Sequence, residues 1–477
     1  MATLTLAAGA AAAAAVGGCA VNPVTGERQL SLISEGQEIR MGEDYARQVE
    51  ASIGLVDDDA LQAYVSGIGK TLAAGSERPQ LPWRFAVVDD PTPNAFALPG
   101  GFIYVTRGLL SLMDSEAELA AVIGHEIGHV TARHSVSHMS RQQIAQLGLG
   151  LGMIFVPAVA EVGDLAGAGL QLLFLKYGRD DEHQADELGF RYAFANHYDV
   201  RQMSDVFRSL ERAGENAGSS GVPSWLSTHP FPAERIERTN QRVAALERPL
   251  PELNTGEGEY MGQIDAVVYG TNPRNGYFRG AAFLHPELRF RIDLPEGWQY
   301  QNMTQAVMAG SPQQDALIQL TLAQGTPEAA ARQFLSQQGI RGTAPTRETV
   351  NGLSAVSARF EAQTEDAVLR GDALYIAHRG DTYQILAYTR AARFSDYEPV
   401  FRRSLGSFAR LTDAQALGVQ PDRIEVVRVP ENMTLAQFNQ RYPSEIDITE
   451  LALINQLSGP DQTIPAGTRV KRVTGGS

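Results

Sequence analysis

Apolar side chains in the first half of the chain recur mostly at helical spacing, with one strand-like interruption. Residues 33–73, 179–215 and 232–247 place apolar residues every three or four positions, which predicts helices on these segments. Between the first two of them, the apolar runs 85–88 and 102–105 are separated by residues that favour turns, and we expect strands there. The pattern therefore predicts a mainly helical region that holds a small sheet.

The stretch 144–175 has a different character, because it is apolar and rich in Gly, Leu and Ala. Its longest uncharged run, 142–160, approaches the length of a membrane span, but several glycines and a proline interrupt it. We therefore expect a bent helical pair that is buried or rests on a membrane surface, in preference to a transmembrane helix.

The pattern changes again after residue 245. Prolines and a Thr-Gly pair weaken the periodicity over 246–275, which predicts a linker. In 276–412, strand-like runs alternate with two helical stretches, 326–338 and 394–408, so we expect an α+β domain. By pattern alone this domain resembles PsbP-type sheets.

The last part of the chain, 422–474, resembles a second kind of module. Its segments 427–435, 453–457 and 464–470 resemble a LysM module, a small βααβ fold that often binds N-acetylglucosamine polymers. The resemblance implies peptidoglycan as a partner. The opening turn departs from the usual Gly-Asp-Thr-Leu, and a degenerate copy with a structural role is the alternative.

Composition narrows the class of protein. The 477 residues carry 40 Lys and Arg against 55 Asp and Glu, a formal net charge of −15. This balance argues against nucleic acid as a partner, because such binding depends on cationic contacts to phosphates. An apolar share of 43% supports folded cores, and the length fits about three domains. The single cysteine excludes an intramolecular disulfide.

The position of that cysteine, Cys19, indicates a lipid anchor. It follows a short Ala-rich run that ends in Gly17 and Gly18, and this order resembles the lipobox of bacterial lipoprotein signal peptides. The resemblance implies that residues 1–18 are a signal peptide and that Cys19 is acylated; an ordinary signal-peptidase site is the alternative. No Lys or Arg precedes Cys19, which departs from the usual basic start. Ala20 implies the outer membrane, by resemblance to enterobacterial sorting.

Two histidines four residues apart carry the strongest chemical signal. Ser115 and Glu118 have the spacing of a capping box, which predicts the start of a helix. At about 100° per residue, His125 and His129 project from one face of that helix and can share a zinc ion. Glu126 lies close enough to act as the general base for a water molecule. The motif therefore predicts one Zn²⁺ per chain.

Spacing alone leaves the third metal ligand open. His134, at the expected end of the same helix, is nine residues from His125 and would face away from it on a straight helix. Downstream, Glu182 and Asp186 are four residues apart on one face of another predicted helix. A third ligand and a carboxylate that orients a ligating histidine would have this spacing. A solvated acidic face is the alternative.

Several motifs together resemble the gluzincin family of zinc metallopeptidases that includes the CAAX prenyl protease, HtpX and BepA. They are the HExxH helix, the segments 93–101 and 179–186, and the Ser-Thr-His-Pro motif at 227–230 with Arg235 after it. The similarity covers about residues 19–245. The resemblance implies that the zinc ligands are His125, His129 and Glu182, that the base is Glu126, and that the supporting carboxylate is Asp186.

Two further features suit a protease of unfolded chains. Asn94, Ala95 and Phe96 lie on a candidate edge strand, which can bind an extended peptide by β-addition with little sequence selectivity. His229 is a candidate donor to the oxyanion of the tetrahedral intermediate. Its alternative role is to cap a turn beside Pro230.

These features predict a multidomain chain. A mainly α zincin-like metalloprotease domain with a small edge-strand sheet occupies 19–245, and the α+β domain and the LysM-like module follow. We expect a zinc-dependent endopeptidase, lipid-anchored on the periplasmic side of the envelope, that degrades misfolded or unassembled envelope proteins. Two other functions stay open: an envelope chaperone or scaffold with little proteolysis, and a peptidoglycan-associated peptidase.

Overall fold

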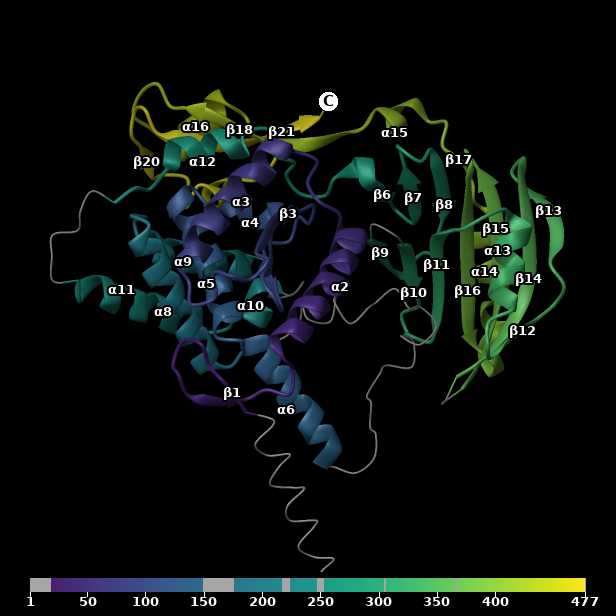
Figure 1. Ribbon diagram of the computed structural model, residues 1–477. Coiled ribbons are helices and arrows are strands. Elements are labelled where there is room, and N and C mark those ends of the chain that lie inside the picture. The colour runs from purple at the N-terminus through teal and green to yellow at the C-terminus, as the bar shows by residue number, and fades with distance from the viewer. Residues whose placement is uncertain are drawn as a thin grey trace, which may run out of the picture. The chain divides into compact units, whose positions relative to one another are not determined.

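The computed structural model describes residues 19–148, 176–216, 224–246, 253–303, 306–364 and 367–476. These residues divide into two compact units (Figure 1). Each unit has its own hydrophobic core. The first unit is built from the chain up to Gly270 together with Asp422–Thr474, and the second from Thr271–Pro421. The signal peptide expected at 1–18 and most of the apolar stretch 144–175 lie outside the described residues. Within the described ranges, no helix is both long and apolar enough to cross a membrane.

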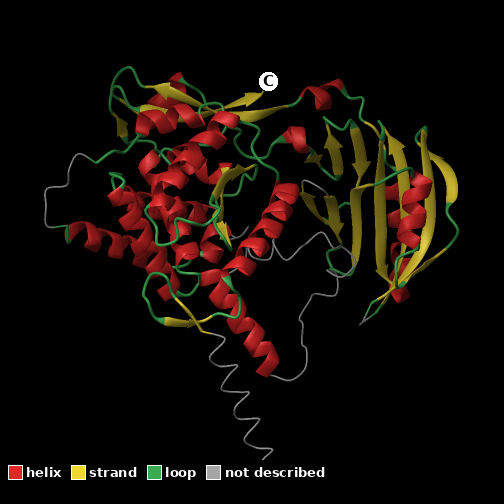
Figure 2. Ribbon diagram, in the orientation of Figure 1, coloured by secondary structure: helices red, strands yellow, loops and turns green. Residues whose placement is uncertain are grey.

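The first unit is mainly helical, as its periodicity predicts (Figure 2). The predicted helical stretch 33–73 consists of two helices, which Ser34 and Asp58 cap by accepting backbone N–H bonds. The first of them ends at Gly54, whose φ of 84° suits glycine. The helices of this unit are α2 (Glu35–Ile53), α3 (Asp59–Ala74), α4 (Arg107–Leu112), α5 (Glu116–Thr131), α6 (His134–Gly148), α8 (Arg179–Ala195), α9 (Gln202–Asn216), α10 (Ser224–Thr228), α11 (Pro232–Ala244), α12 (Glu257–Ile264), α16 (Leu435–Arg441) and α17 (Ile448–Ile454).

A three-stranded sheet lies in the same unit. Strands β3 (Arg84–Val88) and β5 (Phe102–Thr106) are parallel neighbours, and β4 (Ala95–Leu98) runs antiparallel to β5. The order β3-β5-β4 places β4 at one edge of this sheet. Near the start of the described chain, β1 (Cys19–Val21) pairs with β2 (Arg28–Leu30).

The segment 246–275, expected as a linker, holds helix α12. Its Tyr260, Met261 and Ile264 are buried in the core of the first unit, and the Tyr260 hydroxyl donates to the Leu110 carbonyl at 2.6 Å. Three apolar residues on eight positions are too few to stand out among the surrounding prolines and glycines. The burial of this helix depends on the core that the rest of the unit provides.

Residues 422–474 also contribute to this unit. Strand β18 (Gln420–Arg428) pairs with β21 (Arg469–Gly476), and β19 (Met433–Thr434) pairs with β20 (Thr463–Ile464). Helices α16 and α17 lie between these strands in sequence. Apolar side chains of this segment belong to the same core cluster as those of α3, α5 and α9. The segment therefore shares one core with the helices that precede it.

The second unit is an α+β structure around an eight-stranded antiparallel sheet, to which a four-stranded sheet is added (Figure 2). Two neighbouring residues of β15 (Val368–His378) belong to different hydrophobic clusters. Leu374 packs with the residues of α14 (Phe394–Gly406), and Tyr375 packs with those of α13 (Pro327–Leu335). Successive side chains of a strand point to opposite faces, so the two helices cover opposite faces of the large sheet. Its strands are β9 (Gln299–Met303), β10 (Ala306–Gly310), β11 (Ala316–Ala323), β12 (Ile340–Gly342), β13 (Thr346–Val350), β14 (Leu353–Gln363), β15 (Val368–His378) and β16 (Asp381–Arg390), and those of the smaller sheet are β6 (Tyr277–Arg279), β7 (Ala282–His285), β8 (Phe290–Asp293) and β17 (Ala409–Arg410).

Candidate metal centre

Helix α5 carries the HExxH residues through the middle of the first unit. Ser115 and Glu118 form the expected capping box at its start, and residues 117–131 are all buried. A helix that is buried on every side is held by close-packed neighbours. The buried helix therefore fixes the positions of the three residues of the motif that carry its chemistry: His125, Glu126 and His129.

Helix α8 brings the second half of the site against α5. The two helices approach closely at three glycines, where an added Cβ on Gly124, Gly128 or Gly189 would lie 2.7–3.1 Å from backbone atoms of the facing helix. Any larger residue at these positions would force the helices apart. The short separation lets Glu182 and Asp186 of α8 reach the histidines of α5.

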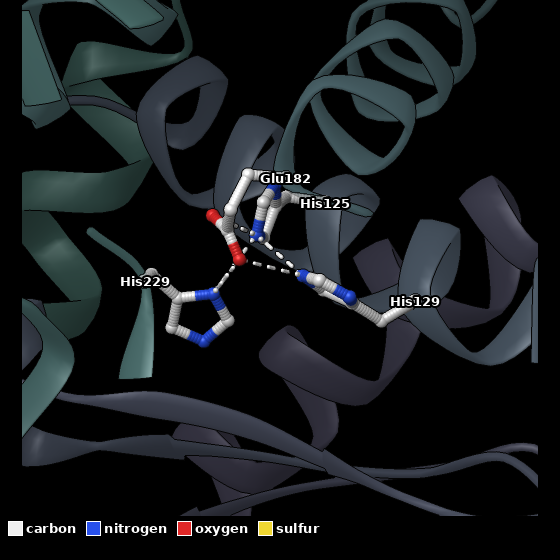
Figure 3. Close-up of side chains that lie close together, drawn as sticks. All are labelled: His125, His129, Glu182 and His229. Carbon is white, nitrogen blue, oxygen red and sulfur yellow. Dashed lines mark hydrogen bonds and ion pairs between the residues drawn. The ribbon is translucent and has the colours of Figure 1, made fainter. Parts of the chain in front are cut away.

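Four side chains converge on one point (Figure 3). They are His125, His129, Glu182 and His229, all buried, with their donor atoms within 4.8 Å of one another. His125 Nε2 lies 2.9 Å from His129 Nε2 and 3.2 Å from His229 Nδ1. Glu182 Oε1 lies 3.0 Å from His229 Nδ1 and 3.5 Å from His129 Nε2.

This donor set fits a zinc ion. Zinc is commonly bound by imidazole nitrogens and carboxylate oxygens at about 2.0–2.2 Å in a tetrahedron, which separates the donors by about 3.3 Å. The observed separations of 2.9–3.5 Å bracket that value. The structure thus brings together the two histidines that share a helical face and the glutamate that the family resemblance implied. It also adds His229, which was expected only as an oxyanion donor.

Asp186 contacts His125 on the side of the ring that faces away from the other donors. Its Oδ1 lies 2.8 Å from His125 Nδ1, so the ring donates there and keeps Nε2 directed at the other donors. Arg235 binds both carboxylates of α8, with Nε 2.8 Å from Asp186 Oδ2 and Nη1 3.0 Å from Glu182 Oε2. The guanidinium also lies over the rings of Phe207 and Trp225, at 4.1 and 4.7 Å from the centroids. Arg235 therefore fixes both carboxylates of the site.

His134 does not face away from the site, contrary to the expectation from a straight helix. Helix α5 ends at Thr131, and Arg133 has a φ of 61°, which redirects the chain. As a result His134 Nδ1 lies 2.9 Å from His129 Nδ1, and its Nε2 lies 2.9 Å from the side-chain oxygen of Gln184. His134 supports His129 from behind as Asp186 supports His125, and it stays outside the four donors.

The charges of the site favour the protonation states that metal binding needs at Glu182 and at His129. Burial raises the pKa of Glu182, but His229 and Arg235 outweigh this effect and hold it well below the usual value. Burial lowers the pKa of His129 well below its usual value, so the ring is neutral. Ligating carboxylates are ionised and ligating histidines are neutral. At His229, burial lowers the pKa, but the carboxylates of Glu182 and Glu126 outweigh it and raise the pKa above its usual value.

Glu126 stands beside the four donors and outside their set. Both of its carboxylate oxygens are buried, and neither accepts a hydrogen bond from any described residue. His229 Nε2 lies 3.5 Å from Oε1. Burial raises the pKa of Glu126, which brings this carboxyl group closer to the range of a general base.

The residues expected to bind substrate lie at the edge of the small sheet. Ala95 and Phe96 belong to β4, and Asn94 precedes it and accepts the Thr106 N–H at its carbonyl. The side-chain oxygen of Asn94 is buried without a hydrogen-bond partner among the described residues. Strand β4 contacts α5, so this edge is next to the helix that carries the metal-binding histidines.

Comparisons with known proteins agree with this geometry. Residues 59–243 match the model of peptidase family M48. The chain is 30% identical to the beta-barrel assembly-enhancing protease of Yersinia pestis, in an alignment of 259 residues that covers 52% of each chain. It is also 30% identical to the protein of the same name from Escherichia coli K12, in an alignment of 262 residues that covers 53% of each chain. It is also 30% identical over 234 residues to the mitochondrial metalloendopeptidase OMA1 of Schizosaccharomyces pombe, across 46% of this chain and 65% of that protein.

The chain spans about half the length of the bacterial relatives. Among solved structures, the cyanobacterial PsbP of Synechocystis sp. PCC 6803 aligns with 28% of this chain and 94% of its own, at 13% identity and a TM-score of 0.24. This similarity is too low to establish a shared fold.

Proposed function

We propose that the protein is a zinc-dependent endopeptidase that degrades misfolded or unassembled envelope proteins, since residues 59–243 match the model of peptidase family M48. One observation carries the proposal: four buried zinc-type donors surround one point, and beside it stands the carboxylate of Glu126, which accepts no hydrogen bond from any described residue. A metal site with only a structural role would have no need for that carboxylate.

The residues of the site have separate roles in metal binding, proton transfer and positioning. Zinc, when bound, supplies a Lewis acid that polarises the scissile carbonyl and lowers the pKa of water. Glu126 takes the proton from the attacking water and passes it to the leaving amine. Asp186 and Arg235 keep the ligands in place, since both act on His125 or Glu182 from the protein side.

We propose that the ring of His229 takes two positions during the reaction. Catalytic zinc sites usually have three protein ligands and leave the fourth position for water or substrate, whereas four protein ligands close the site. Because His229 is the one donor outside helices α5 and α8, it is the ligand that we expect to give way when substrate binds. Its ring would then be placed to donate to the oxyanion, the role that the sequence suggested.

An extended polypeptide suits the edge strand β4. The main chain of a substrate can pair with residues 94–96 whatever its side chains, which fits a protease that accepts many unfolded proteins. The names of the bacterial relatives, beta-barrel assembly-enhancing proteases, support envelope proteins as the substrate class. A peptidoglycan-associated peptidase remains a second candidate only through the LysM-like pattern of 422–474.

We further propose that acylated Cys19 anchors the protein in the outer membrane, on its periplasmic side. Support comes from the lipobox-like order before Cys19 and from Ala20 after it. Cys19 lies in β1 at the start of the described chain. Since one acyl chain binds a membrane only marginally, stable anchoring requires the several chains of a mature lipoprotein.

The test combines metal analysis with cleavage assays on the chain from residue 20 onward. We expect about one zinc per chain, cleavage of an unfolded protein such as casein, and slow or no cleavage of a folded one and of cell-wall stem peptides. Zinc without any cleavage would favour the chaperone or scaffold function instead. Cleavage confined to stem peptides would favour the peptidoglycan-associated enzyme.

A further inference from the structure

A fully buried lysine joins the C-terminal segment to the start of the metal-binding helix. Lys471, on β21, has no exposed surface, and its ammonium donates to the carbonyls of Ser111 and Met113 at 2.9 and 2.7 Å. It also lies 2.7 Å from Oδ1 of Asp114. Three oxygens therefore surround an ammonium that has three hydrogens to donate: two accept hydrogen bonds, and the third belongs to an ion pair. All three oxygens lie between the last turn of α4 and the start of α5.

A second contact from the same segment reaches the capping box itself. Gln456 Nε2 donates to Glu118 Oε1 at 2.7 Å and to the Leu112 carbonyl at 3.1 Å. The other oxygen of Glu118 accepts the backbone N–H groups of Asp114 and Ser115. Glu118 thus connects the cap of α5 to the C-terminal segment.

The contact brings the ammonium of Lys471 close to two acidic side chains, Glu118 and Asp114. Glu118 is fully buried and Asp114 is partly buried, and burial raises the pKa of both carboxyl groups, that of Glu118 to about 8. Lys471 is the cation that lies against them. Burying an ammonium is costly, so a lysine at this position requires the three oxygens that surround it here.

Apolar side chains around this contact pack into the core that contains helix α5. Leu451, Leu453 and Ile454 of α17 belong to the same hydrophobic cluster as the residues of α5 and α9. Arg212 of α9 donates to the Leu457 carbonyl at 2.6 Å. A segment that only tethered the enzyme to a cell-wall polymer would have no need of such a buried, hydrogen-bonded contact with the catalytic helix.

We infer that residues 422–474 are a positioning element of the peptidase, in which Lys471 and Gln456 hold the start of helix α5 in place. Glu118 precedes His125 by seven residues, which is about 10 Å along the helix. Because α5 is one continuous helix, a shift at its start passes to the histidines and to Glu126. Misplacement of reacting groups by about 1 Å can lower a rate by about 10²-fold. This inference rests on the proposed peptidase function for its kinetic consequences.

The test compares two neighbouring residues of β21 in the full chain. Lys471→Met keeps the length and volume of the side chain and removes the three contacts with the start of α5. Arg472→Met is the matched control, because Arg472 pairs with Glu425 inside the same segment, at 2.8 Å. Gln456→Met is the milder second variant, which removes only the contacts with Glu118 and Leu112.

In Lys471→Met we expect kcat per zinc-loaded chain to fall by about 10- to 100-fold with KM changed less than about twofold. Backbone amides in 113–125 should lose hydrogen-exchange protection in the same variant. Gln456→Met should show a smaller fall in kcat and a smaller loss of hydrogen-exchange protection. Arg472→Met should keep the wild-type kcat and the wild-type protection of α5.

Equal kcat and equal exchange in Lys471→Met and Arg472→Met would overturn the inference. A rise in KM alone would also overturn it, since it would show that the segment binds substrate and does not position the helix. The exchange measurement needs no activity, so it decides the inference even if the wild-type chain proves unable to cleave proteins, which would refute only the proposed function.

Discussion

Replacement of Gly189 by alanine tests whether the close approach of α5 and α8 holds the metal site together. The added Cβ would lie 2.7 Å from His125 N and 3.0–3.1 Å from backbone atoms of Gly124 and His125. Ordinary contact begins at 3.4 Å, so the helices must separate by about 0.7 Å at this point. None of the obstructing atoms can rotate away, because all of them belong to the backbone.

Moving α5 and α8 apart should lower both the unfolding free energy and the affinity of the site for zinc. Overpacking of a core typically costs about 1–3 kcal/mol of unfolding free energy. The same shift draws Glu182 and Asp186 away from the histidines of α5, and loss of such support typically lowers metal affinity or activity by about 10–100-fold. We therefore expect Gly189→Ala to lose both stability and zinc affinity.

The assay measures unfolding by denaturant and zinc affinity by competition with a chelator. Gly67→Ala is the control, since Gly67 is an exposed residue of helix α3 with no atom within 4 Å of the added Cβ. The control should keep zinc affinity and gain about 0.5–1 kcal/mol, because alanine favours a helix over glycine. If Gly189→Ala binds zinc as tightly as Gly67→Ala and unfolds no more easily, close helix packing is not what assembles the site.

Three further substitutions test separate parts of the account. Glu182→Ala should lose zinc, measured as metal per chain after dialysis, because two imidazoles and a displaceable His229 hold the ion poorly; full zinc content would contradict its role as a ligand. Asp186→Asn should retain zinc when metal is in excess and lose about 10–100-fold in affinity or activity, and a wild-type value would show that the contact with His125 is dispensable. Cys19→Ala should release the protein from salt-washed membranes or block its processing, and a correctly processed variant that stays membrane-bound would refute the lipid anchor.

Local signals in the sequence accounted for the helices of the site. The capping box at Ser115 and Glu118 and the four-residue spacing of the histidines are short-range features, and α5 forms where they predicted it. The strand around residues 94–96 was expected from the family resemblance and was a candidate edge strand, and β4 lies at an edge of the sheet. The capping box and the histidine spacing depend on residues close together in the chain.

The parts that the sequence did not reveal depend on residues far apart in it. Arg235 lies 49 positions from Asp186, and its role is visible only once α8 and α11 are folded. His134 turns back towards His129 because of a single positive φ at Arg133, which the helical pattern does not encode. Lys471 lies 358 positions from Met113, so the contact between the C-terminal segment and α5 had no local signal.

The central claim is that Glu126 performs chemistry at a metal site that it does not help to build. Glu126→Gln keeps the shape of the side chain and removes the base, so the claim is tested by measuring zinc content and turnover of an unfolded protein on the same preparation. We predict about one zinc per chain, as in the wild type, and a rate lower by about 10²–10⁴-fold. A Glu126→Gln protein that cleaves at the wild-type rate with zinc bound, or that loses its zinc, would contradict the account.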